Sequence, residues 1–276
     1  MSFYFGSHID ISRGLIPETK NLIKAGGNLV QIYLTRPGFI KTNPDSLNEL
    51  LQFNKFAHKN NIRIIVHCAY THNIAKPWDK YSPWINTILD EIHFAHLCGA
   101  FAVVLHFGKQ LNLSISQAYN NMFTSLVYIN KLSQSYNNVK ILLETPAGQG
   151  SELCSSLPDL AHFYNKIKKN KILHSRIKLC IDTCHLFAAG YCFDNLPSFF
   201  SSFDSLIGLD NIFLVHLNDS KVSCGSKKDR HANIGNGFIG FNKLKSIFDF
   251  FKNKHISIVL ETPNYGYLHE IKQLYK

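Results

Sequence analysis

The sequence predicts a protein of the α/β class, a single-domain TIM (β/α)8 barrel, and three observations support this prediction. Its 276 residues are close to the roughly 250 residues of one such barrel. Short apolar segments alternate with helix-length segments along the whole chain, as βα units of a parallel sheet do. Six apolar segments end in a histidine or a carboxylate, and active sites form at the carboxyl ends of barrel strands.

Eight apolar segments are predicted to be strands, because short continuous apolar runs are typical of parallel strands that are buried on both faces. They are Phe3–Ser7, Asn28–Leu34, Ile62–His67, Ala102–His106, Lys140–Glu144, Ile177–Asp182, Asn211–His216 and Ser257–Glu261. The predicted helices are Pro17–Ala25, Ser46–Lys59, Pro83–Cys98, Ser114–Ser135, Pro158–Lys168, Leu196–Leu206, Phe241–Lys252 and Tyr267–Tyr275. Eight βα units favour a closed barrel over an open sheet, and no Pro/Gly-rich linker divides residues 1–276.

Composition bears on the compartment and the partners. No apolar run approaches the roughly 20 residues of a membrane helix, and the N-terminus has no secretory signal, so we expect an intracellular protein that is not secreted. Seven cysteines without a CxxC pair favour free thiols in a reducing compartment over a disulfide framework. The net charge of +10 is compatible with a nucleic-acid partner, although a lysine-rich composition alone gives the same charge.

Six predicted strand ends carry residue types that bind zinc. A lone histidine there is more often a hydrogen-bonded core residue, but an unpaired carboxylate behind three apolar residues is costly. The alternative to a metal is an ion pair with a loop arginine such as Arg36 or Arg230. Because a metal satisfies all six residues together, we predict as ligands His67, His106, Glu144, Asp182, His216 and Glu261.

The segment CIDTCHLFAAGY adds a seventh candidate. His185 follows Asp182 by three residues, so both side chains can reach adjacent metal sites. Cys180 and Cys184 lie beside them, but strand alternation and the oxygen ligands nearby favour small buried thiols over thiolate ligands.

The connection from residue 218 to residue 240 is polar, glycine-rich and unusually long, and long loops of this kind are usually functional. Its Asp229 and His231 are two positions apart, so in extended backbone they point to the same side. By themselves they fit a charged loop face equally well. With His185 they form the three-ligand set that is typical of a catalytic zinc.

Nine candidate ligands are too many for one zinc ion and are about enough for three. Three Zn²⁺ ions against four carboxylates leave a site of about +2, which suits an anion such as a phosphodiester. A cluster of this kind would generate a hydroxide nucleophile at neutral pH, hold the scissile phosphate and stabilise the leaving oxygen.

Five motifs resemble the signatures of the endonuclease IV family, the zinc-dependent apurinic/apyrimidinic (AP) endonucleases of base-excision repair. They occur in the family's order along almost the whole chain. The resemblance implies a TIM barrel with three zinc ions at its C-terminal face. The motifs are LLETPAGQG (142–150), CIDTCHLFAAGY (180–191), VHLNDSK (215–221), DRHANIGNGFIG (229–240) and LETPN (260–264).

The resemblance also assigns a role to each candidate ligand. Glu144 would bridge the first and second zinc ions, and Glu261 would also help to orient or deprotonate the attacking water, so both are predicted catalytic residues. The remaining assignments are His67 and His106 for the first zinc, Asp182, His216 and Glu261 for the second, and His185, Asp229 and His231 for the third.

The DNA contacts match the family less closely. Tyr70 corresponds to a tyrosine that the family inserts at the gap left by the missing base, although packing against the barrel rim is the alternative. Thr71 replaces the family's leucine, and the loop Thr35–Asn43 aligns poorly, so its DNA-inserting residue is unassigned and Arg36 is a candidate. Phosphate contacts are expected from the basic loop residues Lys221, Lys227, Lys228 and Arg230.

The function expected from the resemblance is hydrolysis of double-stranded DNA 5′ to an abasic site. This leaves a 3′-hydroxyl, with trimming of blocked 3′ ends as a related activity. The first alternative is a metal-dependent sugar-phosphate isomerase or epimerase on the same barrel, which usually needs fewer metal ions. The second is a damaged-DNA binding protein without catalysis. We expect a monomer with no membrane partner.

Overall fold

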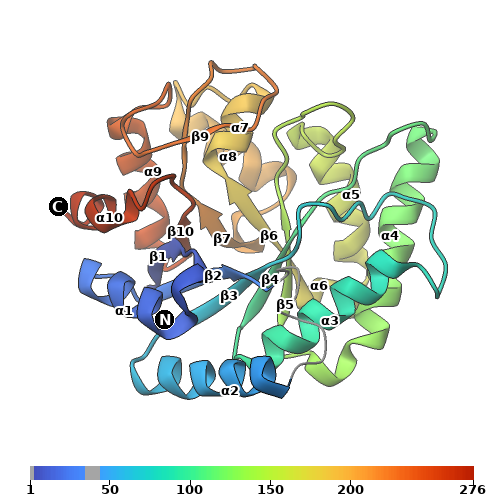
Figure 1. Ribbon diagram of the computed structural model, residues 1–276. Helices are drawn as coiled ribbons and strands as arrows, with labels where there is room; N and C mark the ends of the chain where they lie inside the picture. Colours follow the sequence, from blue (N-terminus) through green and yellow to red (C-terminus); the bar gives the residue numbers. More distant parts are fainter. Residues whose placement is uncertain (1–2, 35–43) are drawn as a thin grey trace.

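The structure, a computed structural model, describes residues 3–34 and 44–276 and contains one closed barrel of eight parallel strands (Figure 1). The strands surround the barrel axis in the order β1-β10-β7-β6-β5-β4-β3-β2. The predicted TIM barrel is therefore confirmed, with strand ends within two residues of those expected. The bounds are β1 Phe5–His8, β2 Leu29–Tyr33, β3 Arg63–His67, β4 Ala102–His106, β5 Lys140–Glu144, β6 Ile177–Asp182, β7 Ile212–His216 and β10 Ser257–Leu260.

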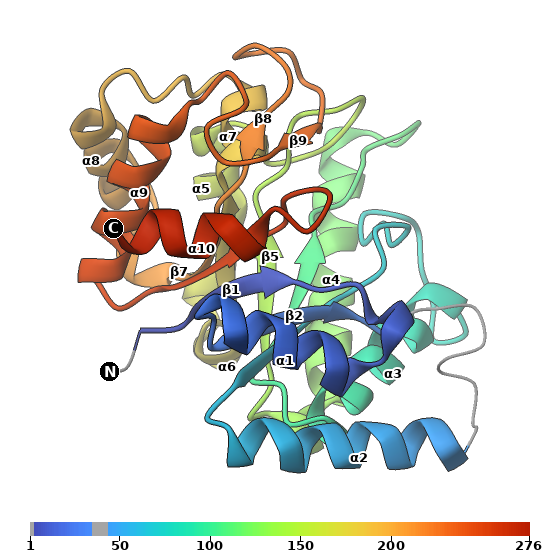
Figure 2. The same ribbon diagram turned by 60° about the vertical axis from the view of Figure 1, so that its left-hand side comes forward.

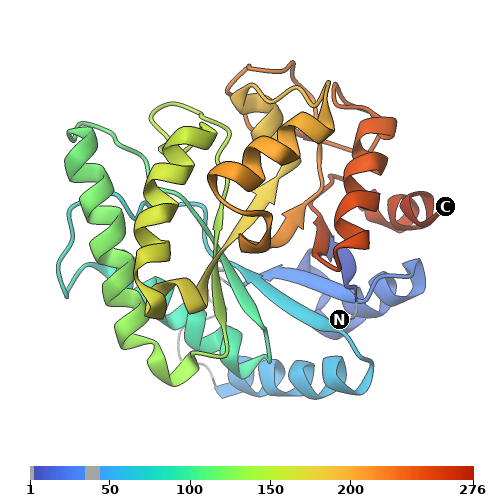
Figure 3. The same cartoon turned by 180° about the vertical axis from the view of Figure 1, so that it is seen from behind.

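Helices surround this barrel, and Figures 2 and 3 show the layer from two further sides. The first and last helices pack against each other, so both ends of the chain contribute to the closure of the ring (Figure 2). The helices are α1 Leu15–Ala25, α2 Pro44–Lys59, α3 Pro83–Leu97, α4 Ile115–Leu132, α5 Leu157–Lys169, α6 Lys171–Arg176, α7 Thr183–Ala189, α8 Leu196–Leu206, α9 Phe241–Asn253 and α10 Tyr267–Tyr275. No helix in these ranges combines the length and the hydropathy needed to cross a bilayer.

The strands are apolar throughout because both of their faces are buried. One face fills the barrel interior with the side chains of Leu29, Ile65, Ala102, Val104, Leu142, Cys180, Leu214 and Val259. The other face packs against the helices, which explains why the runs do not alternate with polar residues. Closure also depends on Gly6 in β1, because a Cβ atom there would lie 1.6 Å from the backbone oxygen of Leu29 in β2.

Four short elements were not expected from the sequence. The helices α6 and α7 are too short for a helical period to be visible, and β8 (Asp219–Ser220) and β9 (His231–Ala232) form a two-residue antiparallel pair inside the long polar connection. Two of these elements matter for the site, since α7 carries His185 and β9 begins with His231.

The prediction that all cysteines are free thiols is wrong for two of the seven. Cys192 and Cys224 form a disulfide with a Cα–Cα distance of 5.5 Å, and the other five are free and buried. The paired cysteines are 32 positions apart in the sequence. The fold brings them together because the 218–240 connection returns to the C-terminal end of α7, where Gly225 N–H bonds to the carbonyl of Phe187.

Candidate metal centre

The nine predicted ligands meet at the mouth of the barrel. Strand register makes several of them neighbours, since His106 lies opposite Glu144 and Asp182 lies opposite His216. The mouth contains a cavity of about 310 Å³. Seven of the nine line this cavity, whereas Asp182 and His216 lie below it and are fully buried.

Glu144 lies at the centre of the group and is 1% exposed. Its Oε2 atom lies 3.3 Å from His67 Nε2 and 3.4 Å from His106 Nε2. Its Oε1 atom lies 2.8 Å from His216 Nδ1. Each oxygen therefore faces a different set of histidines, the arrangement that a bridging carboxylate needs. Burial alone would raise the pKa of Glu144, but His106 and His216 and the hydrogen bonds from His216 and His67 hold it well below its ordinary value.

Asp182 also uses its two oxygens for different purposes. Oδ1 accepts the backbone N–H of His185 at 2.8 Å and so caps α7, which fixes the position of His185. Oδ2 accepts from Asn218 Nδ2 at 2.7 Å and lies 3.6 Å from His231 Nε2. Burial raises the pKa of Asp182, and His185 and His231 oppose that rise.

The third group consists of His185, Asp229 and His231. The Nε2 atoms of the two histidines lie 3.3 and 3.2 Å from the same Asp229 Oδ1, yet neither nitrogen makes a hydrogen bond. Ligand atoms held 2.0–2.1 Å from a tetrahedral zinc are about 3.3 Å apart, so these separations match the edges of one coordination tetrahedron. Two histidine nitrogens and one carboxylate oxygen at these separations form a donor set that fits zinc.

Four of the five histidines have a hydrogen-bond acceptor for the ring nitrogen that faces away from the group. Such contacts fix the tautomer of metal-binding histidines and leave the other nitrogen free to bind. The pairs are His67 Nδ1 with Cys68 O at 2.8 Å, His185 Nδ1 with Thr145 O at 2.8 Å, His231 Nδ1 with Glu261 O at 3.3 Å, and His216 Nε2 with Gln31 Oε1 at 2.8 Å.

Neighbouring carboxylates raise the pKa of four of the five histidines in this group. Burial lowers the pKa of a histidine, but Glu144 overcomes burial at His67 and raises its pKa to about 9. Asp182 and Asp229 do the same at His231, whose pKa also rises to about 9. Only His106, where burial dominates, has a lowered pKa of about 4. A cation of higher charge would replace these protons.

The loop that supplies Asp229 and His231 is folded around a buried carboxylate that the sequence analysis did not single out. Asp219 is fully buried, and its oxygens accept the N–H groups of Gly235 and Gly237 at 3.0 Å and of Ile239 at 2.9 Å. A side chain at Gly237 would collide with Asp219, since a Cβ atom there would lie 2.5 Å from its Oδ1. This carboxylate returns the loop to the barrel, so that His231 pairs with Ser220 next to the mouth.

The residues predicted to contact DNA are exposed wherever the structure describes them. Tyr70 is 76% exposed and lines the mouth cavity, which removes the alternative of packing against the rim. Arg230 is exposed. The alternative to a metal required an ion pair between a loop arginine and the strand-end carboxylates, but among residues 3–34 and 44–276 no ion pair joins Arg230 to Glu144 or Glu261. Arg36 and the loop Thr35–Asn43 lie outside the described residues. The exposed loop residues are Thr71, Lys221, Lys227 and Lys228.

The thiols near the centre remain protonated. Burial raises the pKa of Cys184 to about 12 and the pKa of Cys180 well above its ordinary value. Both observations agree with the prediction that they are small buried thiols and not thiolate ligands.

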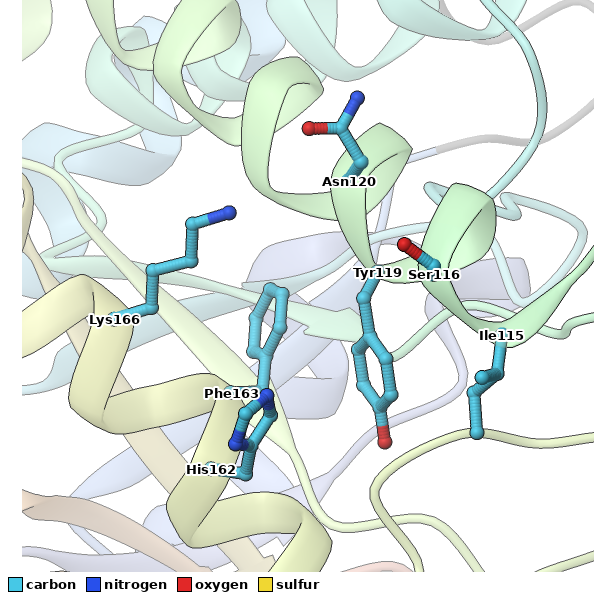
Figure 4. A pocket seen from close by; sticks show the side chains of 7 residues that line it. All are labelled: Ile115, Ser116, Tyr119, Asn120, His162, Phe163 and Lys166. Carbon is cyan, nitrogen blue, oxygen red and sulfur yellow. The ribbon is translucent and has the colours of Figure 1, made fainter.

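A second hollow, of about 410 Å³, lies between α4 and α5 (Figure 4). The ring of Tyr119 stacks on Phe163 there with a centroid distance of 5.9 Å, and Lys166 lies at the side. The residues that line this hollow include no carboxylate. It therefore offers nothing comparable to the donor set at the mouth.

Comparisons with known proteins identify the family of this chain. Residues 20–276 match a family described as the xylose isomerase-like TIM barrel. A protein of Acanthamoeba polyphaga mimivirus is 35% identical over 95% of this chain and 86% of its own length, and one of Mycoplasma mobile is 36% identical over 94% and 91%. The first is named "Putative endonuclease 4" and the second "Probable endonuclease 4". The crystal structure of endonuclease IV from Thermus thermophilus superimposes with a TM-score of 0.78, covering 99% of this chain and 97% of that one at 23% identity.

The curated relatives are similar over nearly the full chain, and the solved structure has the same fold. This chain therefore belongs to the endonuclease IV family among the xylose isomerase-like TIM barrels, and it is a hydrolase of the nuclease type.

Proposed function

We propose that this protein is a zinc-dependent AP endonuclease that hydrolyses the DNA phosphodiester 5′ to an abasic site and leaves a 3′-hydroxyl. The observation that carries the proposal is the packing of five histidines and four carboxylates, with Cys180 and Cys184 beside them, into overlapping three-residue groups; within each group the donor atoms lie within 4.8 Å of one another. In such a centre the zinc ions supply Lewis acidity and activate water at neutral pH.

The nine residues would form three zinc sites. Glu144 presents one oxygen to each of the first two, as a shared ligand does. The full assignment is His67 and His106 to the first zinc, Asp182, His216 and Glu261 to the second, and His185, Asp229 and His231 to the third.

Glu261 is the proposed group that orients or deprotonates the attacking water. It is less enclosed than Glu144, with a side chain that is 12% exposed towards the mouth cavity. Burial would raise its pKa, but His216 lowers the pKa of Glu261 to about 2. The carboxylate is therefore ionised at neutral pH and able to accept a hydrogen bond that orients the water.

The proposed substrate is double-stranded DNA with an abasic site, with trimming of blocked 3′ ends as a second reaction at the same centre. An abasic site has no base edge to read, so recognition relies on the shape and deformability of the duplex. Tyr70 would fill the gap in the stack, and Lys221 and Arg230 would contact phosphates. Binding should weaken steeply with salt. An intracellular location and a monomeric state remain predictions.

Metal analysis and a nicking assay test the proposal together. The purified protein should contain about three zinc ions per chain and should nick a duplex with one abasic site, but not the same duplex with an intact base. A chelator should abolish nicking, and added zinc should restore it. One or two metal ions without nicking would instead support a sugar-phosphate isomerase or epimerase. Binding of abasic DNA without nicking would support a non-catalytic damage-binding protein.

A further inference from the structure

Gln31 is a buried polar side chain inside the apolar strand β2, and no ligand assignment includes it. It is 0% exposed. Its amide nitrogen lies 2.6 Å from Glu261 Oε1 and 3.2 Å from His8 Nδ1, and its amide oxygen lies 2.8 Å from His216 Nε2. A single amide therefore contacts two of the nine proposed ligands.

The chemistry of these contacts fixes the orientation of the amide. An ionised carboxylate only accepts hydrogen bonds, so the NH₂ group of Gln31 must face Glu261. Its oxygen then faces His216, and Nε2 of this ring must carry a proton in order to donate to it. The Nδ1 atom of His216 is left to face the centre, where it lies 2.8 Å from Glu144 Oε1 and 3.2 Å from Glu261 Oε2.

His216 differs in this respect from the other three histidines whose outer nitrogen has a partner. Those three use backbone carbonyls, of Cys68, Thr145 and Glu261, which no substitution removes. The tautomer of His216 alone depends on a side chain. Asn218, also fully buried, supplies the complementary contact to the remaining ligand of the same zinc, since its Nδ2 donates to Asp182 Oδ2 at 2.7 Å.

We infer that Gln31 is a positioning residue for the second zinc site, where it holds His216 and Glu261 in the geometry that binds the ion. The inference rests on the zinc centre of the proposed function. An uncharged amide suits this place, because it donates to one ligand and accepts from the other without adding charge. A carboxylate there would place a second negative group 2.6 Å from Glu261.

The test measures zinc binding without DNA. Gln31→Met keeps a similar volume and removes the hydrogen bonds to Glu261 and His216, together with the contact to His8. Partners of metal ligands typically contribute 10–100-fold to metal affinity, so one of three zinc ions should bind roughly 10–100-fold more weakly while the other two bind as in the wild type. Dialysis against buffered free zinc followed by metal analysis resolves these steps.

Asn28→Ala is the matched control. Asn28 directly precedes β2, and its amide bonds to Phe5 N at 2.7 Å and to Phe3 O at 3.3 Å, far along the strand from the ligands. It removes an amide from the same barrel wall and should leave all three zinc affinities unchanged.

Equal zinc affinities in Gln31→Met and the wild type would overturn the inference, and so would a uniform loss at all three sites. A wild-type protein that binds no zinc would instead refute the proposed function. If Gln31→Met does not fold, nitrogen-15 NMR of the zinc-loaded wild type gives an independent answer. The inference requires a protonated Nε2 and a metal-bound Nδ1 at His216, and the opposite tautomer would contradict it.

Discussion

Raising the pH from 6.5 to 9 should destabilise the metal-free protein and not the zinc-loaded one. In the absence of metal, the pKa values of His67 and His231 are raised to about 9 by the carboxylates around them. The unfolded chain loses the same protons near pH 6.5. The native chain therefore binds more protons than the unfolded chain in this window, and the free energy of unfolding falls as the pH rises through it.

The raised pKa values of His67 and His231 set the size of the effect. One histidine shifted from 6.5 to about 9 contributes roughly 3 kcal/mol below pH 6.5 that is lost by about pH 9. The histidines share the same carboxylates, so their contributions do not add, and we count one full shift. With an m value of roughly 3 kcal/mol per molar urea, the unfolding midpoint should fall by about 1 M. His106 does not interfere, because its lowered pKa of about 4 acts below this window.

Urea unfolding of chelator-treated and zinc-loaded samples, followed by the fluorescence of Trp78 and Trp84, measures the difference. Both tryptophans pack against the core, so their emission reports on global unfolding. Zinc requires deprotonated ligands and binds more tightly as the pH rises, so the loaded protein should keep or gain stability. A metal-free midpoint that is unchanged or higher at pH 9 would refute the idea that protonated histidines hold the empty centre together.

Three substitutions test separate parts of the structure. Asp229→Asn should lower the zinc content from three ions to two and slow nicking by at least about 100-fold. Asp249→Asn, at a similarly exposed residue, is the control and should change neither quantity. Unchanged nicking by Asp229→Asn would contradict the third zinc site. Tyr70→Ala should weaken the binding of abasic duplex by roughly 10-fold without loss of zinc. The control is Tyr81→Ala, which changes another exposed tyrosine. Equal binding by the two variants would show that Tyr70 does not contact the DNA. Gly6→Ala should destabilise the fold by several kcal/mol, because its Cβ atom would overlap backbone in the next strand, and a midpoint within 0.5 M urea of the wild type, which corresponds to about 1.5 kcal/mol, would contradict this.

The barrel and the convergence of the six strand-end ligands were predictable because one feature of the sequence indicates both, whereas His185, Asp229 and His231 come from α7 and the long connection. A continuous apolar run identifies a strand buried on both faces, and its last residue lies at the barrel mouth whatever the details of packing. Glu144 and Asp182 end such runs, and the structure finds them in register with His106 and His216. The sequence placed these residues at one end of the barrel without any knowledge of side-chain contacts.

The residues that hold the ligands in place were not predictable, for a physical reason. Gln31 and Asn218 act through hydrogen bonds to side chains far away in the sequence, and the residues next to them in the sequence do not indicate those partners. Gln31 is a polar residue that interrupts an apolar run, so by itself it argues against a buried strand. The disulfide was missed for the same reason, because pairing of Cys192 with Cys224 depends on the path of a long loop.

The segment that carries Tyr70 shows how such a hidden contact shapes a surface. Glu91, fully buried in α3, accepts the N–H of Ala69 at 3.1 Å and contacts His72 Nε2 at 3.0 Å. One carboxylate thus holds the chain on both sides of Tyr70 and Thr71, and both of these residues are exposed. A substitution at Thr71 therefore changes which side chain is presented at this position, while the anchor that presents it lies in the core and is independent of that residue.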